Sequence, residues 1–163
     1  MPRTAVHTRD ESLDKALHLF WRQGFRATSL KDIERALDMR PGSIYAMFGS
    51  KEDLFREALN RYAERTMAEL ERVMAAEQSP LGGLVAYVRM LGGLRDRDQT
   101  CQACMLVKSL LEFGDREEAV RFRVEDLLAR MERRFTESFA EAQKAGEVSA
   151  ELDPERLGRR LQA

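Results

Sequence analysis

The chain is poor in the features that mark several large classes of protein. Its 163 residues hold two cysteines and four prolines, and its longest apolar runs are too short to span a bilayer. Residues 1–10 have polar side chains throughout and no apolar core, unlike a signal peptide. We therefore expect a cytoplasmic protein with no membrane partner, and neither a secreted disulfide framework nor an integral membrane protein.

Neither sign of charge dominates the chain, since 27 Lys and Arg stand against 28 Asp and Glu. The first 50 residues carry eight basic and six acidic side chains, a mild surplus with the sign expected of a part that faces nucleic acid. That surplus decides nothing alone. At 44% hydrophobic and 34% charged residues, the composition is that of a globular protein able to form a core without a metal or disulfide.

The sequence pattern predicts helices, because no segment sustains the apolar–polar alternation of a strand. Helix starts are predicted where a polar capping residue is followed three positions later by an acidic one, as in Thr8 with Glu11 and Ser29 with Asp32. Glycines after apolar stretches predict helix ends. We expect Arg95–Asp98 to form a solvated turn. The last helix has no stop signal, so we expect the natural chain to continue past Ala163. The expected helices span about 10–23, 29–37, 41–48, 50–78, a stretch after Pro80, 101–113, 115–145 and 154 onward.

The second and third of these helices have the spacing of a helix-turn-helix. They are short and are joined by the tripeptide 38–40, and the second member of such a pair can enter the major groove of DNA. Gly42 and Ser43 at its start would let the backbone approach phosphates closely. Lys51, at the start of the next helix, could reach a neighbouring phosphate.

Two stretches of this region resemble the TetR (tetracycline-repressor) family of bacterial transcription regulators: GFRATSLKDI at 24–33 and GSIYAMFGSKEDLF at 42–55. The resemblance implies an all-α protein, with a three-helix helix-turn-helix domain over 1–50 and a helical ligand-binding and dimerisation domain over 51–163. It implies a homodimer that binds a palindromic double-stranded DNA operator, most often as a repressor that a small-molecule inducer releases.

The resemblance also assigns DNA contacts. The residue matching Thr28 caps the second helix and touches the DNA backbone, and the recognition helix begins with Arg40, Pro41, Gly42 and Ser43. Tyr45 and Lys51 match phosphate contacts, against the alternatives of a core aromatic and a solvated lysine. The sequence departs from the family at Asp38, in place of a turn glycine, and at Arg40-Pro41, in place of Ser-Lys. Arg40 is then the expected base reader, by bidentate contact to guanine.

The family places its ligand cavity on the middle helices and its dimer seam on later ones. The alternative for each of the residues named below is that it packs in the core of the chain and contacts neither a ligand nor a second subunit. The residues matching the cavity are Tyr62, Thr66, Tyr87, Met90, Cys104, Met105 and Lys108, and those near the seam are Leu127, Met131, Phe135 and Phe139.

Cys101 and Cys104 form a C-x-x-C pair, but His7 and His18 supply no second pair of ligands, so we expect no metal and no cofactor. The pair is either two ordinary cysteines or a thiol-based redox or electrophile sensor acting through Cys104, as in some TetR relatives. Lys108, one helical turn on, would favour the thiolate. No nucleophile–base set is present, so we do not expect an enzyme.

Overall fold

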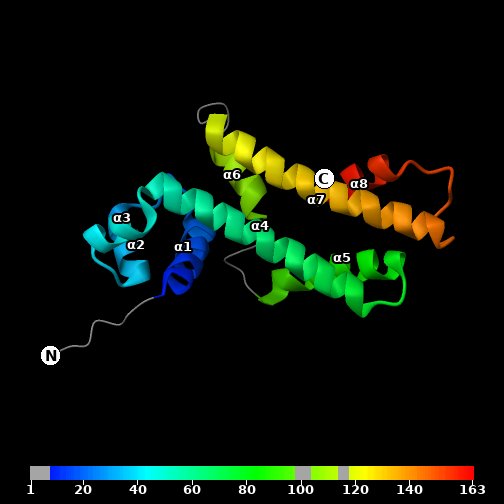
Figure 1. The fold of residues 1–163 in the computed structure, drawn as a ribbon, viewed down its shortest axis with the longest axis horizontal. Coiled ribbons are helices and arrows are strands. Elements are labelled where there is room, and N and C mark those ends of the chain that lie inside the picture. The colour runs from blue at the N-terminus through cyan, green and yellow to red at the C-terminus, as the bar shows by residue number, and fades with distance from the viewer. Residues whose placement is uncertain (1–7, 98–103, 114–117) are drawn as a thin grey trace. The chain divides into compact units, whose positions relative to one another are not determined.

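The computed structural model describes residues 8–97, 104–113 and 118–163, and these residues form eight α-helices without a strand (Figure 1). The predicted all-α fold is confirmed. No helix among these residues combines the length and hydropathy that a bilayer crossing requires. The helices are α1 Arg9–Gln23, α2 Leu30–Leu37, α3 Pro41–Phe48, α4 Lys51–Ala76, α5 Pro80–Arg97, α6 Met105–Phe113, α7 Glu118–Lys144 and α8 Pro154–Gln162.

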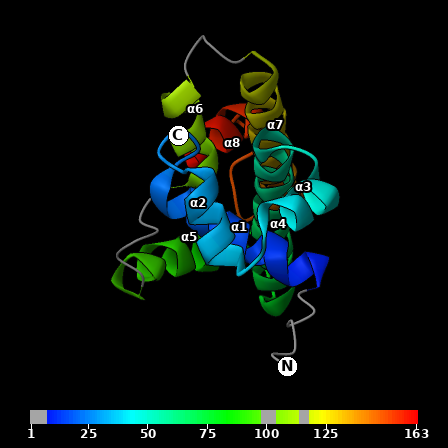
Figure 2. The ribbon, with the colours of Figure 1, turned by 90° about the vertical axis from the view of Figure 1, so that its left-hand side faces the viewer.

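The helices belong to two compact units. Unit 1 contains the described residues of 1–63 and 103–121, and unit 2 those of 64–102 and 122–163. Unit 1 therefore holds α1, α2 and α3, the first half of α4, and α6 (Figure 2). The predicted domain boundary at residue 50 stays a prediction.

The predicted helix starts are confirmed by their hydrogen bonds. The Thr8 hydroxyl accepts from the backbone N–H of Glu11 at 3.2 Å, and the Glu11 carboxylate accepts from the N–H of Thr8 at 3.1 Å. Ser29 and Asp32 make the same reciprocal pair at 3.2 and 2.9 Å. Each pair satisfies two amides that have no partner inside the helix, so the side chains themselves fix where α1 and α2 begin.

Helix ends follow the predictions where the structure describes them. Gly24 ends α1 with φ +80°, and Gly146 follows α7 with φ +76°. The prediction of a turn at Arg95–Asp98 is wrong as far as Arg97, because α5 continues through Arg97 and no proline or glycine interrupts it there. The expected helix boundaries at 101 and 115 lie outside the described residues.

Four phenylalanines form the centre of unit 1. Phe25 lies 5.0 Å from Phe55 and 5.3 Å from Phe113 between ring centroids, and Phe20 meets Phe55 edge-on at 5.1 Å. All four are at most 7% exposed. Because they come from α1, α4, α6 and the α1–α2 connection, burying them fixes these segments against one another.

Unit 2 joins α4, α5 and α7 by both apolar and polar contacts. The Tyr87 ring of α5 lies 6.0 Å from that of Phe135 on α7. The Arg134 guanidinium of α7 donates to both carboxylate oxygens of Glu71 on α4, at 2.5 and 3.2 Å. This planar two-point contact fixes the guanidinium on one carboxylate.

Candidate nucleic-acid interface

The turn between α2 and α3 has the geometry of a helix-turn-helix. Asp38 ends α2 in the left-handed region, with φ +54° and ψ +44°, so it takes the turn conformation that glycine would otherwise supply. Two residues later Arg40 is the N-cap of α3, and Pro41 occupies its first turn. The predicted start and end of the third helix are confirmed.

One face of α3 is exposed and the other is buried. Ile44 and Phe48 are 3% and 5% exposed and hold the helix on unit 1. The outward side carries the predicted recognition residues except Pro41, which is half-buried, and it also carries Ala46, which was not predicted although it stands three residues after Ser43 on the same face. Three of its residues, Gly42, Ser43 and Ala46, are small, so the backbone beside them can approach a groove closely. The exposed residues are Arg40, Gly42, Ser43, Tyr45 and Ala46.

Tyr45 and Lys51 differ in how their side chains are held. Tyr45 is 48% exposed, so its ring is not part of the core. Lys51 is half-buried, with its ammonium 4.2 Å from the centroid of the Phe25 ring. A cation over an aromatic face is attracted by the ring's quadrupole, so Phe25 orients the Lys51 side chain. The phosphate contacts of both residues stay predictions.

Thr28 lies inside unit 1. The expectation that it caps the second helix is wrong, because the Ser29 side chain makes the capping bond to Asp32. Thr28 is 1% exposed, and its hydroxyl donates to the carbonyl oxygen of Gly24 at 2.5 Å. Its DNA contact stays a prediction, with very little surface available for it.

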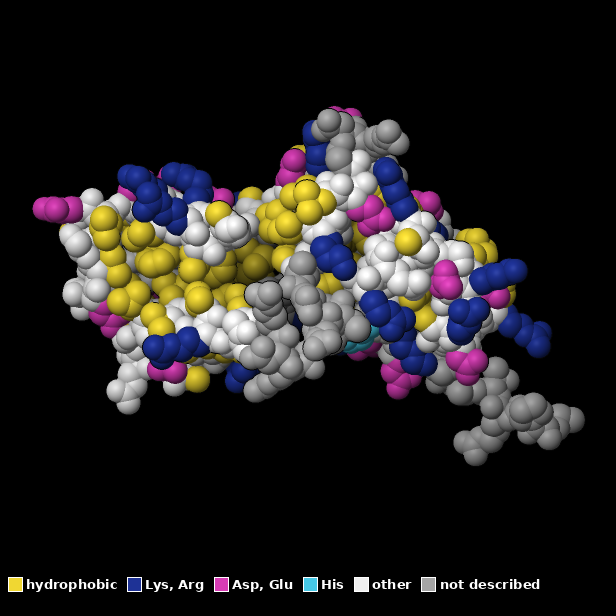
Figure 3. All heavy atoms as spheres, turned by 180° about the vertical axis from the view of Figure 1, so that it is seen from behind, with side chains coloured by type: hydrophobic (Ala, Val, Ile, Leu, Met, Phe, Trp, Pro, Cys, Tyr) yellow, Lys and Arg dark blue, Asp and Glu magenta, His cyan; other side chains and the backbone are white. Residues whose placement is uncertain are grey.

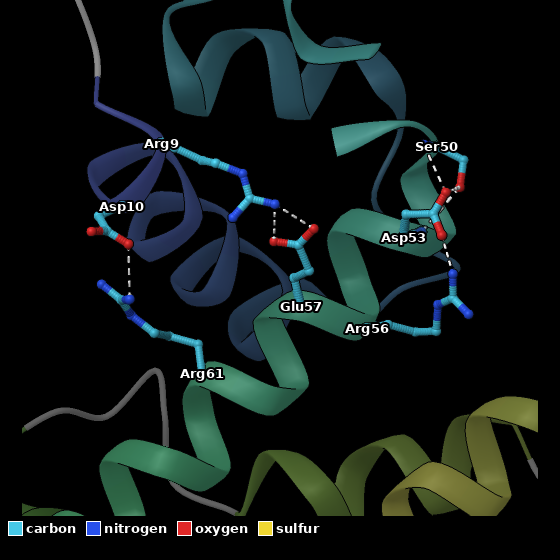
Figure 4. A network of polar contacts seen from close by, with 7 residues as sticks. All are labelled: Arg9, Asp10, Ser50, Asp53, Arg56, Glu57 and Arg61. Atoms are coloured by element: carbon cyan, nitrogen blue, oxygen red, sulfur yellow. Dashed lines mark hydrogen bonds and ion pairs between the residues drawn. The ribbon is translucent and has the colours of Figure 1, made fainter. Parts of the chain in front are cut away.

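Ion pairs join the starts of α1 and α4 (Figure 4). Arg9 on α1 pairs with Glu57 on α4 at 2.6 Å, and Arg61 on α4 pairs with Asp10 at 3.0 Å. Arg61 also donates to Asp14 at 3.0 Å. These ion pairs join α1 to α4 at the surface, beside the apolar contacts of the core.

The first turn of α4 is capped by Ser50. Its hydroxyl accepts from the N–H of Asp53 at 3.0 Å and donates to the Asp53 carboxylate at 2.6 Å. Arg56 also donates to this carboxylate (Figure 4). The Ser50 hydroxyl, and then Arg56, hold the pKa of Asp53 below its ordinary value. The pKa of Asp32 is lowered in the same way, chiefly by its hydrogen bond with the Ser29 hydroxyl.

The predicted ligand residues are distributed over both units. Tyr62, Cys104, Met105 and Lys108 belong to unit 1, and the other three, Thr66, Tyr87 and Met90, to unit 2. Met105 is 1% and Tyr87 2% exposed, so both are core residues of the structure as it stands. Among the described residues, no three His, Cys, Asp or Glu side chains are grouped so as to hold a metal ion. Cys101 lies outside the described residues.

The predicted dimer residues are mostly buried within one chain. Leu127, Met131 and Phe135 are 2%, 9% and 4% exposed, whereas Phe139 is half-buried. These three residues belong to the core of their own chain, and their place near a dimer seam stays a prediction. Figure 3 shows apolar side chains gathered on one face of unit 2. The exposed large apolar residues of this unit include Val85, Val88 and Leu91 on α5, Phe122 on α7, and Leu152 before α8.

The helix-turn-helix, its exposed α3 face and the helical second unit define the class of helix-turn-helix transcription regulators. Residues 13–58 match the family described as bacterial regulatory proteins of the tetR family, and residues 80–163 match the tetracyclin repressor-like C-terminal domain. The chain belongs to the TetR family. The transcriptional repressor ComR of Escherichia coli is 30% identical over 152 residues, which are 93% of this chain and 72% of ComR.

Solved structures agree with this assignment. A cysteine-substituted form of the TetR-family regulator CifR, complexed with 26-base-pair operator DNA, is 30% identical with a TM-score of 0.86 over 99% of this chain and 84% of that one. The reduced form of NemR from E. coli is 20% identical, with a TM-score of 0.83 over 94% of this chain and 80% of NemR, and supports the fold alone.

Proposed function

We propose that this chain is a homodimeric repressor that reads a palindromic operator through α3 and is released by a small-molecule inducer. The exposed face of α3 is the observation that carries the proposal. Arg40 stands at its N-terminal end, where a guanidinium can make a bidentate contact to guanine. Tyr45 is exposed further along α3, and Lys51 begins the next helix. These two supply sequence-independent contacts to phosphates.

The proposed mechanism depends on distance. Two α3 helices of a dimer must stand about 34 Å apart to enter successive major grooves on one side of the duplex. An inducer that favours a packing with a different spacing weakens operator binding, and by linkage the operator weakens inducer binding equally. Met90 is half-buried and gives a test. Met90→Trp should change which small amphipathic molecules release DNA, while the ligand-free variant binds DNA normally.

Fluorescence anisotropy tests the proposal directly. The reduced protein is titrated into DNA from upstream of its own gene and into a scrambled duplex, over a series of salt concentrations. We expect tight binding to the native fragment only, weakening steeply with salt because phosphate contacts release counterions. Equal and weak binding to both duplexes would argue against the proposal for this operator, and sedimentation of the protein shows whether a dimer is present.

A second candidate function is a thiol sensor on the same scaffold. Cys104 is a free thiol, half-buried at the start of α6, and CifR was solved as a cysteine-substituted form. In this alternative Cys104, with Cys101, carries the signal and no inducer binds. Cys104→Ser should then abolish the response to peroxide or N-ethylmaleimide and keep operator affinity. A response that survives the substitution rules this alternative out.

A further inference from the structure

Two charged side chains of α6, one helical turn apart, both reach the end of α1. Lys108 Nζ donates to the carbonyl oxygen of Trp21 at 2.6 Å. The Glu112 carboxylate accepts from the backbone N–H of Phe25 at 2.9 Å and from that of Arg26 at 2.5 Å. We name Lys108 and Glu112 the α6 clamp. All these residues lie in unit 1.

The charges of the α6 clamp match the backbone that they contact. The last carbonyls of a helix lack partners inside it and carry partial negative charge, so an ammonium on Trp21 is favourable. Gly24 then turns the chain with φ +80°, and the next two amides donate to a single carboxylate. A Cβ at Gly24 would lie 2.8 Å from Glu112 Oε2, so this glycine also leaves the room that the carboxylate occupies.

The clamped segment leads directly into the helix-turn-helix. Thr28 closes it from within, because its hydroxyl donates to the Gly24 carbonyl at 2.5 Å and its N–H donates to the Phe25 carbonyl at 3.2 Å. Ser29, the next residue, is the N-cap of α2. A shift of residues 24–26 therefore moves the start of α2, and with it the α2–α3 pair.

α6 belongs to one part of the chain by sequence and to another by packing. It lies within residues 80–163, which match the C-terminal domain of the family, but it packs in unit 1 with the helix-turn-helix. Its Phe113 ring contacts Phe25 at 5.3 Å and Phe55 at 5.5 Å. The polar clamp is thus anchored by an apolar contact one residue from Glu112.

We propose that Lys108 and Glu112 are positioning residues for DNA binding, which hold the α1–α2 connection in the conformation that presents α3 to the operator. The inference rests on the proposed DNA-binding function and adds two residues, Lys108 and Glu112, on which the presentation of α3 depends. Neither residue touches DNA in this scheme.

The first experiment measures the clamp itself, without DNA. Amide hydrogen exchange is followed by NMR in the full 15N-labelled chain, comparing wild type with Glu112→Gln. We expect the amides of Phe25 and Arg26 to exchange about tenfold faster, because a charge-assisted acceptor is replaced by a neutral one. Glu64→Gln, at an exposed position of α4, is the matched control and should leave both amides unchanged. Unchanged exchange in Glu112→Gln overturns the proposal.

The second experiment measures operator binding, with a duplex that the wild-type protein selects from a random-sequence pool. Removing a negative charge near DNA by itself strengthens binding. The α6 clamp predicts weaker binding instead, so Glu112→Gln should bind the duplex about tenfold more weakly, a loss close to that of one charge-assisted hydrogen bond. Lys108→Met should weaken binding similarly, and the double variant should lose less than the sum of the two.

The readouts separate positioning from direct contact and from unfolding. Both variants should keep the wild-type dependence of affinity on salt, because no phosphate contact is lost. Thermal unfolding confirms that each variant is folded at the temperature of the titration. Unchanged or tighter operator binding by Glu112→Gln overturns the proposal. If the wild type itself selects no duplex, the proposed function fails, and the exchange rates of Phe25 and Arg26 still decide whether the clamp exists.

Discussion

Gly158 of α8 faces Thr136 of α7 so closely that an added Cβ would stand 3.0 Å from the Thr136 backbone nitrogen and 3.2 Å from the carbonyl oxygen of Glu132. Both of these atoms are backbone and cannot rotate away. Within unit 2, α8 is therefore seated on α7 at a point where only glycine fits.

Gly158→Ala should destabilise the protein although alanine is the better helix former. The propensity gain in a helix is about 1 kcal/mol, whereas overpacking against fixed backbone costs about 1–3 kcal/mol. We expect a lower midpoint of urea unfolding. Gly92→Ala is the control: an added Cβ there meets nothing within 4 Å, so this variant should be at least as stable as wild type. Equal effects at both positions would show that the contact is unimportant.

Thr28→Val tests the buried hydroxyl of Thr28. The substitution keeps the shape of the side chain and removes the hydrogen bond to the Gly24 carbonyl, so the free energy of unfolding should fall by about 1 kcal/mol. Thr28→Ser, which keeps the hydroxyl, should retain the bond. Because the same hydroxyl holds the α1–α2 connection, the folded Val variant should also bind the operator more weakly than the Ser variant.

Substitutions of Arg40 and of Lys51 should change DNA binding in different ways. Arg40→Ala should weaken binding to the preferred duplex by about 1–3 kcal/mol of binding free energy, and it should relax the base preference at one base pair of each half-site. Lys51→Met should weaken binding to all duplexes alike and lower the salt slope by about one unit per protomer. Anisotropy titrations on a set of single-base variants of the operator measure both effects. A uniform loss with Arg40→Ala would contradict its role as a base reader.

Acid should weaken the caps of α2 and α4. Folding lowers the pKa of Asp32 and of Asp53 from an ordinary value of 3.8, so near that pH the folded chain binds fewer protons than the unfolded chain. Their stabilisation is complete above the unfolded value and is lost as the pH falls through the folded values. The double variant Asp32→Asn, Asp53→Asn should be less stable than wild type at neutral pH.

That difference in stability should narrow below about pH 4, where the wild-type carboxylates also become protonated. Urea unfolding at a series of pH values measures this difference, and Glu64→Gln, which removes one carboxylate at an exposed site, shows the effect of losing a negative charge without losing a cap. A difference that is the same at every pH would mean that the charge of the two carboxylates does not contribute.

Local signals predicted much of the fold and of the interface. The boxes Thr8–Glu11 and Ser29–Asp32 are contacts over three residues, and the glycine at position 24 acts through its own φ. Such interactions form between neighbours in the chain, so the sequence shows them directly. The exposure of α3 followed in the same way from the positions of its apolar residues.

Contacts across long stretches of chain were not predictable. The burial of Thr28, the close seat of Gly158 and the core positions of Leu127 and Phe135 depend on what packs against them. A periodic apolar stripe shows that one face of a helix is covered but does not name the element that covers it. This is why residues expected near a dimer seam lie in the core of their own chain.

The amino-acid sequence by itself determined the helices, their caps and the helix-turn-helix, because each rests on side chains within a few residues of one another. Only the tertiary structure decided that Glu112, 86 residues after Arg26, accepts a hydrogen bond from its backbone amide. No sequence pattern predicts that a carboxylate on one helix will meet a backbone amide in a turn far away in the chain. Their pairing depends on how the phenylalanine core of unit 1 packs α6 against α1 and α4.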